Sequence, residues 1–490
     1  MRDLAVVFSL MSAALFAWVL GSEGDEIAYR DLVVFTTALI VILAIQLFLL
    51  YLVYRITGRV LSGRGKYILL LAASILLALN AYYFAFSILE RPIGFRIAFA
   101  AVLGAAFLAL TMFRPARVVL SLFAGIMIVM SLVQYVSTRS MFSGRDVTAE
   151  TVSLPVNSKR NVYLLGAESL HSPEAYREHY GIENPEHLKI LRDAGFRVLD
   201  SAYSAERSTV ISYASILEFV RRRGGDELGA RTVFINDNST FRSFRDSGYS
   251  IQFVYISNYF AANRNNVNYA YPPLNFDACE ELETHYFYGV CSHGVVRLIN
   301  KYIFRSPRIH YREQVAHLKE RADYVLNTSR PWLTITHVKY PFHTHGYFSY
   351  PDEAYTAKFK QMVRTAMPTV AQNIRNTAAY IVAQDPDAVV IVFGDHGTHL
   401  FRGVKKEQVF SESPILPPEK VLLDQHGVMF AVYPANFCVN RMREGFSTMA
   451  MIENLVACLN GNDNPTEDEQ RRARTVRFFG DLHDTAKLAR

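Results

Sequence analysis

Long apolar runs separated by short polar connections make up the first part of the chain. The runs cover residues 4–20, 32–54, 67–89, 97–113 and 118–136. Each is near the ~20 residues that a helix needs to cross a bilayer. The first run could instead be a signal peptide, because it is short and follows Arg2, but residues 21–26 show no clear small-residue cleavage site. The pattern therefore predicts a domain of five transmembrane helices over residues 1–136.

Charge in the connections predicts the orientation of these helices. Basic residues lie between the second and third runs and between the fourth and fifth, namely Arg55, Arg59, Arg64, Lys66, Arg114 and Arg117. The connection 21–31 is mostly acidic, whereas the connection 90–96 fits less well because it carries Arg91 and Arg96. By the positive-inside rule the amino terminus is cytoplasmic, and five crossings place the chain after Tyr135 outside the cytoplasm.

After the last apolar run the pattern changes to that of a soluble domain. Residues 137–159 are rich in Ser, Thr, Arg and Gly and are interpreted as a linker. Strands are predicted at 161–166, 250–256, 332–339, 388–393 and 428–433, and helices at 185–194, 212–222, 306–328 and 355–384. The Val- and Ile-rich strands are typical of strands buried on both faces. We therefore expect residues 160–490 to form an α/β domain with a mainly parallel sheet covered by helices, with a peripheral charged tail at 464–490.

Composition and cysteine usage agree with this organisation. The chain has 490 residues, of which 51% are hydrophobic, and a net charge of +6 without a concentrated basic patch, so nucleic acid is not an expected partner. The four cysteines all lie outside the apolar runs and form two local pairs, Cys279 with Cys291 and Cys438 with Cys458. An oxidising compartment favours at least one disulfide. Four buried free thiols are the alternative, and the spacing is unlike that of a zinc knuckle.

Polar residues that can bind metal or act as acids and bases follow three of the predicted strands. Glu168 follows the strand 161–166, and Asp395 and His396 follow the strand 388–393, with Gly394 and Gly397 around them. Three histidines lie near the end of the strand 332–339, namely His337 within it and His343 and His345 after it. In an open α/β sheet, functional groups gather where the strands end at their carboxyl edge.

Two carboxylates and an imidazole form a suitable ligand set for a divalent metal such as zinc. A metal would also compensate the charge of Glu168 at the end of an apolar strand. The alternatives are that Glu168 caps the helix starting near Ser172 or pairs with an arginine, and that Asp395 and His396 form a polar turn.

These residues resemble the membrane-anchored branch of the alkaline phosphatase and sulfatase superfamily, which includes the lipid A phosphoethanolamine transferases and the lipoteichoic acid synthases. In that family a glutamate after the first strand, a threonine some forty residues later and a late Asp-His pair hold zinc or manganese. The resemblance implies that Glu168, Thr209, Asp395 and His396 are the metal ligands, with zinc the first choice and manganese the alternative. The later stretch EGFSTMAMIENLVACL resembles the helix that follows in the family.

The same resemblance makes Thr209, in the stretch SAERSTVISYASI, the nucleophile that carries the phosphoryl group. A hydroxyl at a helix amino terminus is favoured as an alkoxide by the helix dipole and by a divalent cation. The neighbouring Ser208 is the alternative nucleophile, and a simple helix cap by either residue is the structural interpretation. The stretch lacks the Cys/Ser-x-Pro-x-Arg type of site that a sulfatase needs, so that activity is excluded.

In the family a histidine after the middle strand contacts the phosphate or acts as general acid, and the resemblance implies that His345 or His343 of the PFHTHG stretch has this role. Surface-loop histidines are the alternative, and His426, His399 and His337 are weaker candidates. The nucleophile lacks the flanking disulfide cysteines typical of the phosphoethanolamine transferases, and the FGDH stretch is similar to phosphoglycerol transferases as well. The choice of head group therefore stays open.

The predicted function is transfer of phosphoethanolamine from a membrane phospholipid to an envelope glycan or lipid acceptor. The predicted place is a bacterial inner membrane, crossed several times, with the catalytic domain in the periplasm. Phosphoglycerol transfer is the second choice, and a membrane-tethered phosphatase or phosphodiesterase is the hydrolytic alternative. A non-catalytic glycan or lipid binder is disfavoured, because the Glu, Thr and Asp-His set is intact.

Overall fold

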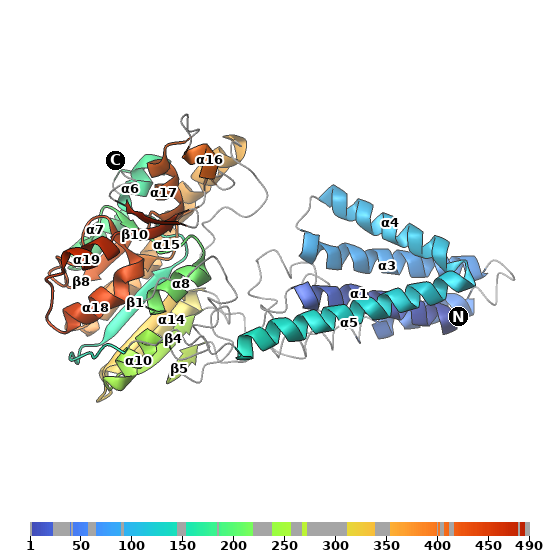
Figure 1. Cartoon of the computed structure of the whole chain (residues 1–490), viewed down its shortest axis with the longest axis horizontal. Helices are drawn as coiled ribbons and strands as arrows, with labels where there is room; N and C mark the ends of the chain where they lie inside the picture. Colours follow the sequence, from blue (N-terminus) through green and yellow to red (C-terminus); the bar gives the residue numbers. More distant parts are fainter. Residues whose placement is uncertain are drawn as a thin grey trace. The chain divides into compact units, whose positions relative to one another are not determined.

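A computed structural model of the chain divides into two compact units, which are described separately (Figure 1). The residues described are 2–22, 40, 43–56, 65–89, 93–144, 153–183, 186–218, 238–255, 267–271, 311–338, 353–398, 400–401, 406–410, 416–478 and 481–485. The first unit takes in the described residues up to 144, and the second unit takes in those from 153 onward.

The first unit is helical wherever it is described within the predicted apolar runs. Its helices are α1 (Arg2–Ser22), α3 (Gly65–Leu89), α4 (Ile93–Thr111) and α5 (Arg114–Gly144), together with the helical residues 43–56. Within these described helices, Pro115–Gln134 is the one segment both long and apolar enough to cross a membrane, and the other apolar helical stretches are shorter. Helix formation is thus observed, and the five-span arrangement remains a prediction.

A buried polar network joins three helical segments of this unit. The Asn80 side chain on α3 donates to Gln46 Oε1 at 3.1 Å and to Ser12 Oγ of α1 at 3.0 Å. Gln46 Nε2 donates to Asn80 Oδ1 at 2.8 Å. All three side chains are buried. Polar side chains among apolar helices stabilise a packing in this way when each finds a partner.

The second unit is built on a seven-stranded sheet with the order β2-β8-β7-β1-β6-β4-β5. Strands β1, β6, β7, β4 and β5 pair in parallel, whereas β8 pairs antiparallel with both β7 and β2. The strand bounds are β1 Val162–Ala167, β2 Arg197–Val198, β4 Ser250–Tyr255, β5 Tyr269–Tyr271, β6 Trp332–Val338, β7 Val389–Gly394 and β8 Phe430–Tyr433. The mainly parallel sheet is therefore confirmed, and the predicted strands lie within two residues of the observed ones.

Helices cover both faces of the sheet, as predicted (Figure 1). One face packs against α8 (Thr209–Glu218), α10 (Ser239–Asp246) and α18 (Met451–Leu459). The other packs against α7 (Glu186–Asp193), α14 (Tyr311–Leu326) and α15 (Glu353–Gln384). Alternate residues of β1 divide between these two cores, with Val162 and Leu164 in the first and Tyr163 and Leu165 in the second. This alternation follows from the two-residue period of a strand.

The carboxyl-terminal part packs onto the domain. Helix α17 (Pro418–His426) precedes β8, and the short β9 (Phe446–Ser447) pairs with β3 (Ala202–Tyr203). The tail contains α19 (Glu467–Arg472) and the hairpin of β10 (Thr475–Phe478) and β11 (Asp481–Asp484). Val476 of β10 is fully buried, so the peripheral tail that we predicted contributes to the core.

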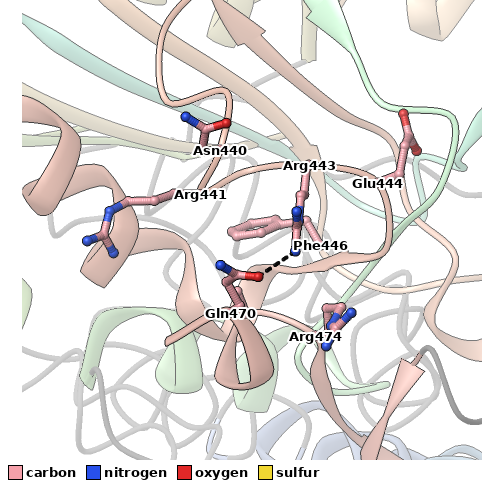
Figure 2. Close-up of a pocket in the computed structure, with 8 residues that line it drawn as sticks. Asn440, Arg441, Arg443, Glu444, Phe446, Gln470 and Arg474 are labelled. Atoms are coloured by element: carbon pink, nitrogen blue, oxygen red, sulfur yellow. Dashed lines mark hydrogen bonds between the residues drawn. The ribbon is translucent and has the colours of Figure 1, made fainter. Parts of the chain in front are cut away.

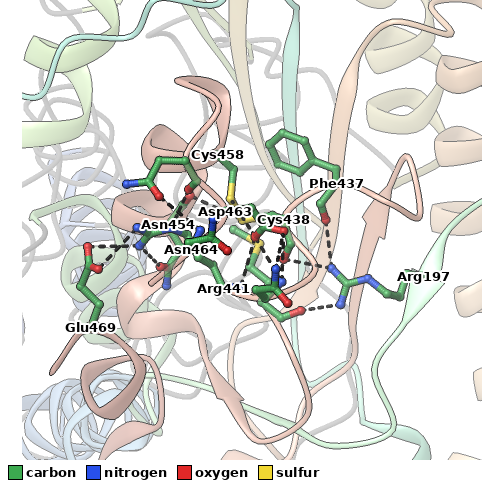
Figure 3. The surroundings of a disulfide bond; sticks show 12 residues. Arg197, Phe437, Cys438, Arg441, Asn454, Cys458, Asp463, Asn464 and Glu469 are labelled. Carbon is green, nitrogen blue, oxygen red and sulfur yellow. Dashed lines mark hydrogen bonds and ion pairs between the residues drawn. A yellow bond between two sulfur atoms is a disulfide. The ribbon is translucent and has the colours of Figure 1, made fainter. Parts of the chain in front are cut away.

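The predicted disulfide between Cys438 and Cys458 is present, with the two Cα atoms 5.5 Å apart (Figure 3). It links the loop after β8 to α18. Beside it the Arg197 guanidinium donates to the carbonyl oxygens of Phe437, Cys438, Met442 and Ala435. The other predicted pair, Cys279 and Cys291, lies outside the described residues.

Candidate active site

The carboxyl ends of β1, β6 and β7 meet at one edge of the sheet. Ala167 at the end of β1 is level with Val338 of β6 and with Gly394 of β7. Glu168 and Asp395 are the next residues along β1 and β7, so both leave the sheet at the same height. The backbone register of three parallel strands thus brings together residues that are more than 200 positions apart, as expected for the carboxyl edge of such a sheet.

Two glycines around Asp395 and His396 permit a close approach of other backbone segments. A Cβ atom on Gly394 would lie 2.2 Å from the carbonyl oxygen of Leu170, and one on Gly397 would lie 1.9 Å from that of Asp424. Neither position has room for a side chain, because atoms at these distances overlap. The glycines of the FGDHG stretch therefore fix a tight turn that is pressed against two neighbouring loops.

The Asp395 carboxylate is fully buried, and its two oxygens have different surroundings. Its Oδ1 accepts hydrogen bonds from the backbone N–H groups of Ser169 and His396, both at 2.8 Å. Its Oδ2 has no hydrogen-bond partner among the described residues. A buried carboxylate oxygen that is left without a donor is costly, and such an atom calls for a compensating charge.

The histidines beside Asp395 are oriented by hydrogen bonds at Nδ1. His396 Nδ1 lies 2.7 Å from the carbonyl oxygen of Gly397, which can only accept, so Nδ1 carries a proton and, in the neutral imidazole, Nε2 carries a lone pair. His337 Nδ1 lies 3.2 Å from the Tyr213 hydroxyl. Because that hydroxyl donates its hydrogen to the Thr336 carbonyl at 3.1 Å, His337 Nδ1 is again the donor.

Electron-rich atoms consequently converge on one buried space. The Nε2 atoms of His396 and His337 lie 3.6 and 4.0 Å from Asp395 Oδ2. In their neutral forms, two imidazoles with protonated Nδ1 atoms and a carboxylate would offer three electron-pair donors to a cation among them. Imidazole and carboxylate are also preferred ligands of zinc and related divalent ions. The residues present therefore fit a divalent metal ion.

Thr209 places its hydroxyl at the same point. It is the first residue of α8, it is 9% exposed, and its Oγ1 lies 3.1 Å from His396 Nε2. Since His396 Nε2 carries a lone pair, the hydroxyl donates and the imidazole accepts. A hydroxyl and an imidazole nitrogen this close together could bind the same divalent ion, and such an ion would activate the hydroxyl as a nucleophile.

Glu168 directly follows β1 at the same edge of the sheet. Its backbone N–H donates to the carbonyl of Val338 at 3.0 Å, and its side chain is 7% exposed. The cap interpretation is wrong, because the hydroxyl of Ser172 caps α6 (Pro173–Ala175) by accepting from Ala175 N at 3.1 Å. Placement of Glu168 after β1 agrees with the predicted ligand position, and its role as a ligand stays a prediction.

The predicted ligands are not drawn together as tightly as a bound ion would draw them. Among the described residues, one set of three has its ligand atoms within 4.8 Å of one another, namely Cys438, Cys458 and Asp463. Its two sulfurs are joined in the disulfide, so that set is no metal site.

The structure places the remaining candidate histidines differently from one another. His343, His345 and His399 lie outside the described residues. His337, a weak candidate by sequence, lies beside Asp395, and the signal that could have identified it is its position on β6 next to Gly166 of β1. His426 ends α17 and is fully buried.

A small cavity elsewhere in the domain does not serve the site. Figure 2 shows it between the loop before β9 and the region of α19, with Arg443 donating to Gln470 at 2.7 Å. Its volume of about 10 Å³ is close to what one water molecule needs. It is therefore too small to hold a lipid head group, and none of its lining residues belongs to the Asp395 group.

No protein-family model and no curated protein matches the chain. Similar solved structures include the C-terminal periplasmic domain of EcEptC from Escherichia coli in complex with Zn, at 14% identity and a TM-score of 0.42, covering 68% of this chain and 97% of that one. Another is the integral membrane lipooligosaccharide phosphoethanolamine transferase A (EptA) from Neisseria meningitidis, at 14% identity, a TM-score of 0.32 and 88% coverage of both chains. A third is an alkaline phosphatase superfamily protein from Vibrio parahaemolyticus, at 10% identity and a TM-score of 0.36, covering 70% of this chain and 80% of that one.

Proposed function

We propose that the chain is a metal-dependent phosphotransferase that moves phosphoethanolamine from a membrane phospholipid to an envelope glycan or lipid acceptor through Thr209. The observation that carries the proposal is the convergence of the Thr209 hydroxyl and His396 Nε2, 3.1 Å apart, beside an Asp395 Oδ2 atom without a hydrogen-bond donor among the described residues, because all three atoms could bind one ion. Asp395, His396, Thr209 and Glu168 would hold the ion, with His337 as an additional ligand. Zinc is the first choice and manganese the alternative. When bound, the ion supplies positive charge that favours the Thr209 alkoxide and the charge developing on phosphorus.

The side chains of the site then perform two successive displacements. In the first, a bond forms between Thr209 Oγ1 and phosphorus, and the bond from phosphorus to the glycerol oxygen breaks, so diacylglycerol leaves with a proton. In the second, an acceptor hydroxyl attacks the phosphothreonine and Thr209 recovers its proton. The amino terminus of α8 favours negative charge at Thr209 in both steps. We assign the proton transfers to His345 or His343, as the sequence motif predicts.

Membrane attachment gives this reaction a physical rationale, because it confines donor and acceptor to the same surface. We propose five transmembrane helices over residues 1–136, a linker at 137–159 and an extracytoplasmic catalytic domain at 160–490. The inner membrane of a bacterium, with the catalytic domain in the periplasm, is the compartment in which phospholipid and envelope acceptors meet. The disulfide between Cys438 and Cys458 supports an oxidising compartment for the second unit.

The covalent intermediate is the direct test. The purified full chain is incubated with phosphatidylethanolamine and, separately, with phosphatidylglycerol, and the mass added to the peptide that contains Thr209 is measured. We expect a phosphoethanolamine adduct and release of diacylglycerol, both lost in Thr209→Ala and partly retained in Thr209→Ser, because serine keeps a hydroxyl at that place.

Other outcomes identify the alternatives. An adduct from phosphatidylglycerol alone would identify a phosphoglycerol transferase, and an adduct on Ser208 would move the nucleophile by one residue. Free phosphoethanolamine as the final product in the presence of acceptor lipids would indicate hydrolysis. Release of diacylglycerol by Thr209→Ala at the normal rate would refute the covalent mechanism.

A further inference from the structure

One short segment, residues 424–429, covers the end of α17 and the connection to β8, and it contacts the described loops beside Glu168, His396 and Thr209. We refer to it as the bridging segment. The loop after Glu168, the turn after His396 and the turn before Thr209 all bond to its backbone. These bonds are Met429 N to Leu170 O (2.8 Å), Gly397 N to Gln425 O (2.9 Å) and Ser204 N to His426 O (2.7 Å).

Asp424 holds the turn that follows His396. Its Oδ1 accepts from the Leu400 N–H at 2.7 Å and from the Thr398 hydroxyl at 3.0 Å, and its Oδ2 accepts from the Phe401 N–H at 2.9 Å. The side chain is buried, and burial raises the pKa of the carboxyl to about 6, so it is ionised at neutral pH. Three donors on one buried carboxylate hold Thr398, Leu400 and Phe401 in place.

His426 holds the turn that leads to Thr209. Its Nδ1 lies 3.1 Å from the carbonyl oxygen and 3.3 Å from the hydroxyl of Ser204. Because that hydroxyl donates to the Glu206 carbonyl at 2.8 Å, it accepts from His426, and Nδ1 is the donor to both oxygens. Burial lowers the pKa of this imidazole to about 4, so it is neutral at neutral pH.

We infer that Asp424 and His426 are positioning residues that set the separation between His396 Nε2 and Thr209 Oγ1. One residue fixes the loop of the Asp-His pair, the other fixes the approach to the nucleophile, and a single residue separates them along the bridging segment. Rotation or displacement of this segment would change the 3.1 Å contact of the site. The sequence suggested a weak role for His426 in contacting phosphate, whereas the structure assigns it to the support of a turn. The inference rests on the proposed function for its catalytic meaning.

The first test replaces Asp424 by Asn, which keeps its size and removes one acceptor oxygen, so one of the three donors then faces an amide N–H. The matched control is Asp385→Asn. Asp385 is also a buried carboxylate that accepts a side-chain hydrogen bond, from Asn161 at 2.8 Å, but it precedes β7 at the opposite edge of the sheet. In Asp424→Asn we expect the rate of Thr209 adduct formation and the zinc affinity each to fall about 10–100-fold, with the KM for donor lipid nearly unchanged. In Asp385→Asn we expect both to stay near wild type.

The second test separates positioning from proton transfer at His426. Asn at this position offers an N–H near the place of Nδ1, whereas Leu offers none, and neither can transfer a proton. Positioning predicts that His426→Asn retains most of the adduct rate and zinc affinity and that His426→Leu loses them. Equal loss in both variants would overturn the inference, because it would make the imidazole itself the required group.

The zinc titration keeps this inference distinguishable from the proposed function. If wild type forms no adduct with either lipid, the proposed transfer fails, and the zinc affinities of the four variants still decide whether the bridging segment positions the site. If Asp424→Asn does not fold, the two His426 variants decide. Wild-type adduct rates and zinc affinities in both Asp424→Asn and His426→Leu would overturn the inference.

Discussion

Removal of the Cys438–Cys458 disulfide should destabilise the second unit by an amount that can be calculated from the length of the chain segment it closes. The bridge joins residues 20 positions apart, so in the unfolded chain it closes a loop of about 20 residues. The loop-closure relation gives about 11 cal/mol/K for this length, or about 3 kcal/mol at 25 °C. The Arg197 guanidinium donates hydrogen bonds to this loop that do not involve the disulfide (Figure 3). The folded loop should therefore persist when the disulfide is removed, and the loss of stability should come from the unfolded state.

The assay is urea unfolding of the full chain in detergent, with both cysteines replaced by Ala. Trp332 begins β6 and is 7% exposed, so its fluorescence reports the second unit. The chain has two tryptophans, and Trp18→Phe in every variant removes the signal from the other. We expect a loss of about 3 kcal/mol in the free energy of unfolding relative to the Trp18→Phe parent.

Reductant provides the control. It should lower the free energy of unfolding of the parent by about as much as the double substitution does. In the substituted chain there is no Cys438–Cys458 bridge to reduce, so the reductant should have no effect through it. A remaining effect there would report a bridge between Cys279 and Cys291. A loss below about 1 kcal/mol would refute the loop-closure reasoning, and a loss well above 5 kcal/mol would show that core packing around the sulfurs dominates.

Three further predictions concern the metal, the topology and the first unit. Single replacement of Glu168, Asp395 or His396 by Ala should abolish bound metal in the purified chain while the second unit stays folded, and full metal content in all three would show structural turns instead. A reporter fused at Glu150 should be active only as a periplasmic reporter, and cytoplasmic activity would reverse the proposed orientation. Replacement of Asn80 by Leu should lower the stability of the first unit in detergent by about 1–2 kcal/mol, because Gln46 and Ser12 lose their partner. An unchanged thermal midpoint would show that the network does not stabilise the packing.

The main strands of the second unit could be predicted from sequence because their burial is uniform. Every residue of β1, β6 and β7 is buried, and such strands appear as short, continuous Val- and Ile-rich runs. Two-residue strands such as β3 and β9 carry no such pattern, since their pairing depends on tertiary contacts. The helix α17 was not predicted from the sequence.

Some residues of the candidate site could be found from the local sequence pattern, whereas others are brought to the site only by the pairing of the strands. Glu168, Asp395 and His396 could be found because they interrupt the apolar pattern at strand ends. His337 could not be ranked in this way, because it lies within β6, where a buried histidine is most often a satisfied core residue. It becomes a site residue through the register of β6 against β1, which brings it to 4.0 Å from Asp395.

The contact between Thr209 and His396 joins positions 187 residues apart, and no single local motif can specify it. The sheet register fixes His396, because β7 ends beside β1 and the turn behind it has no room for a side chain at Gly397. The start of α8 fixes Thr209, and the turn before that helix is bonded to His426. The two halves of the site are thus built by different parts of the fold and share one support, the bridging segment. A change in that segment should therefore alter the chemistry while leaving every residue of the site motifs in place.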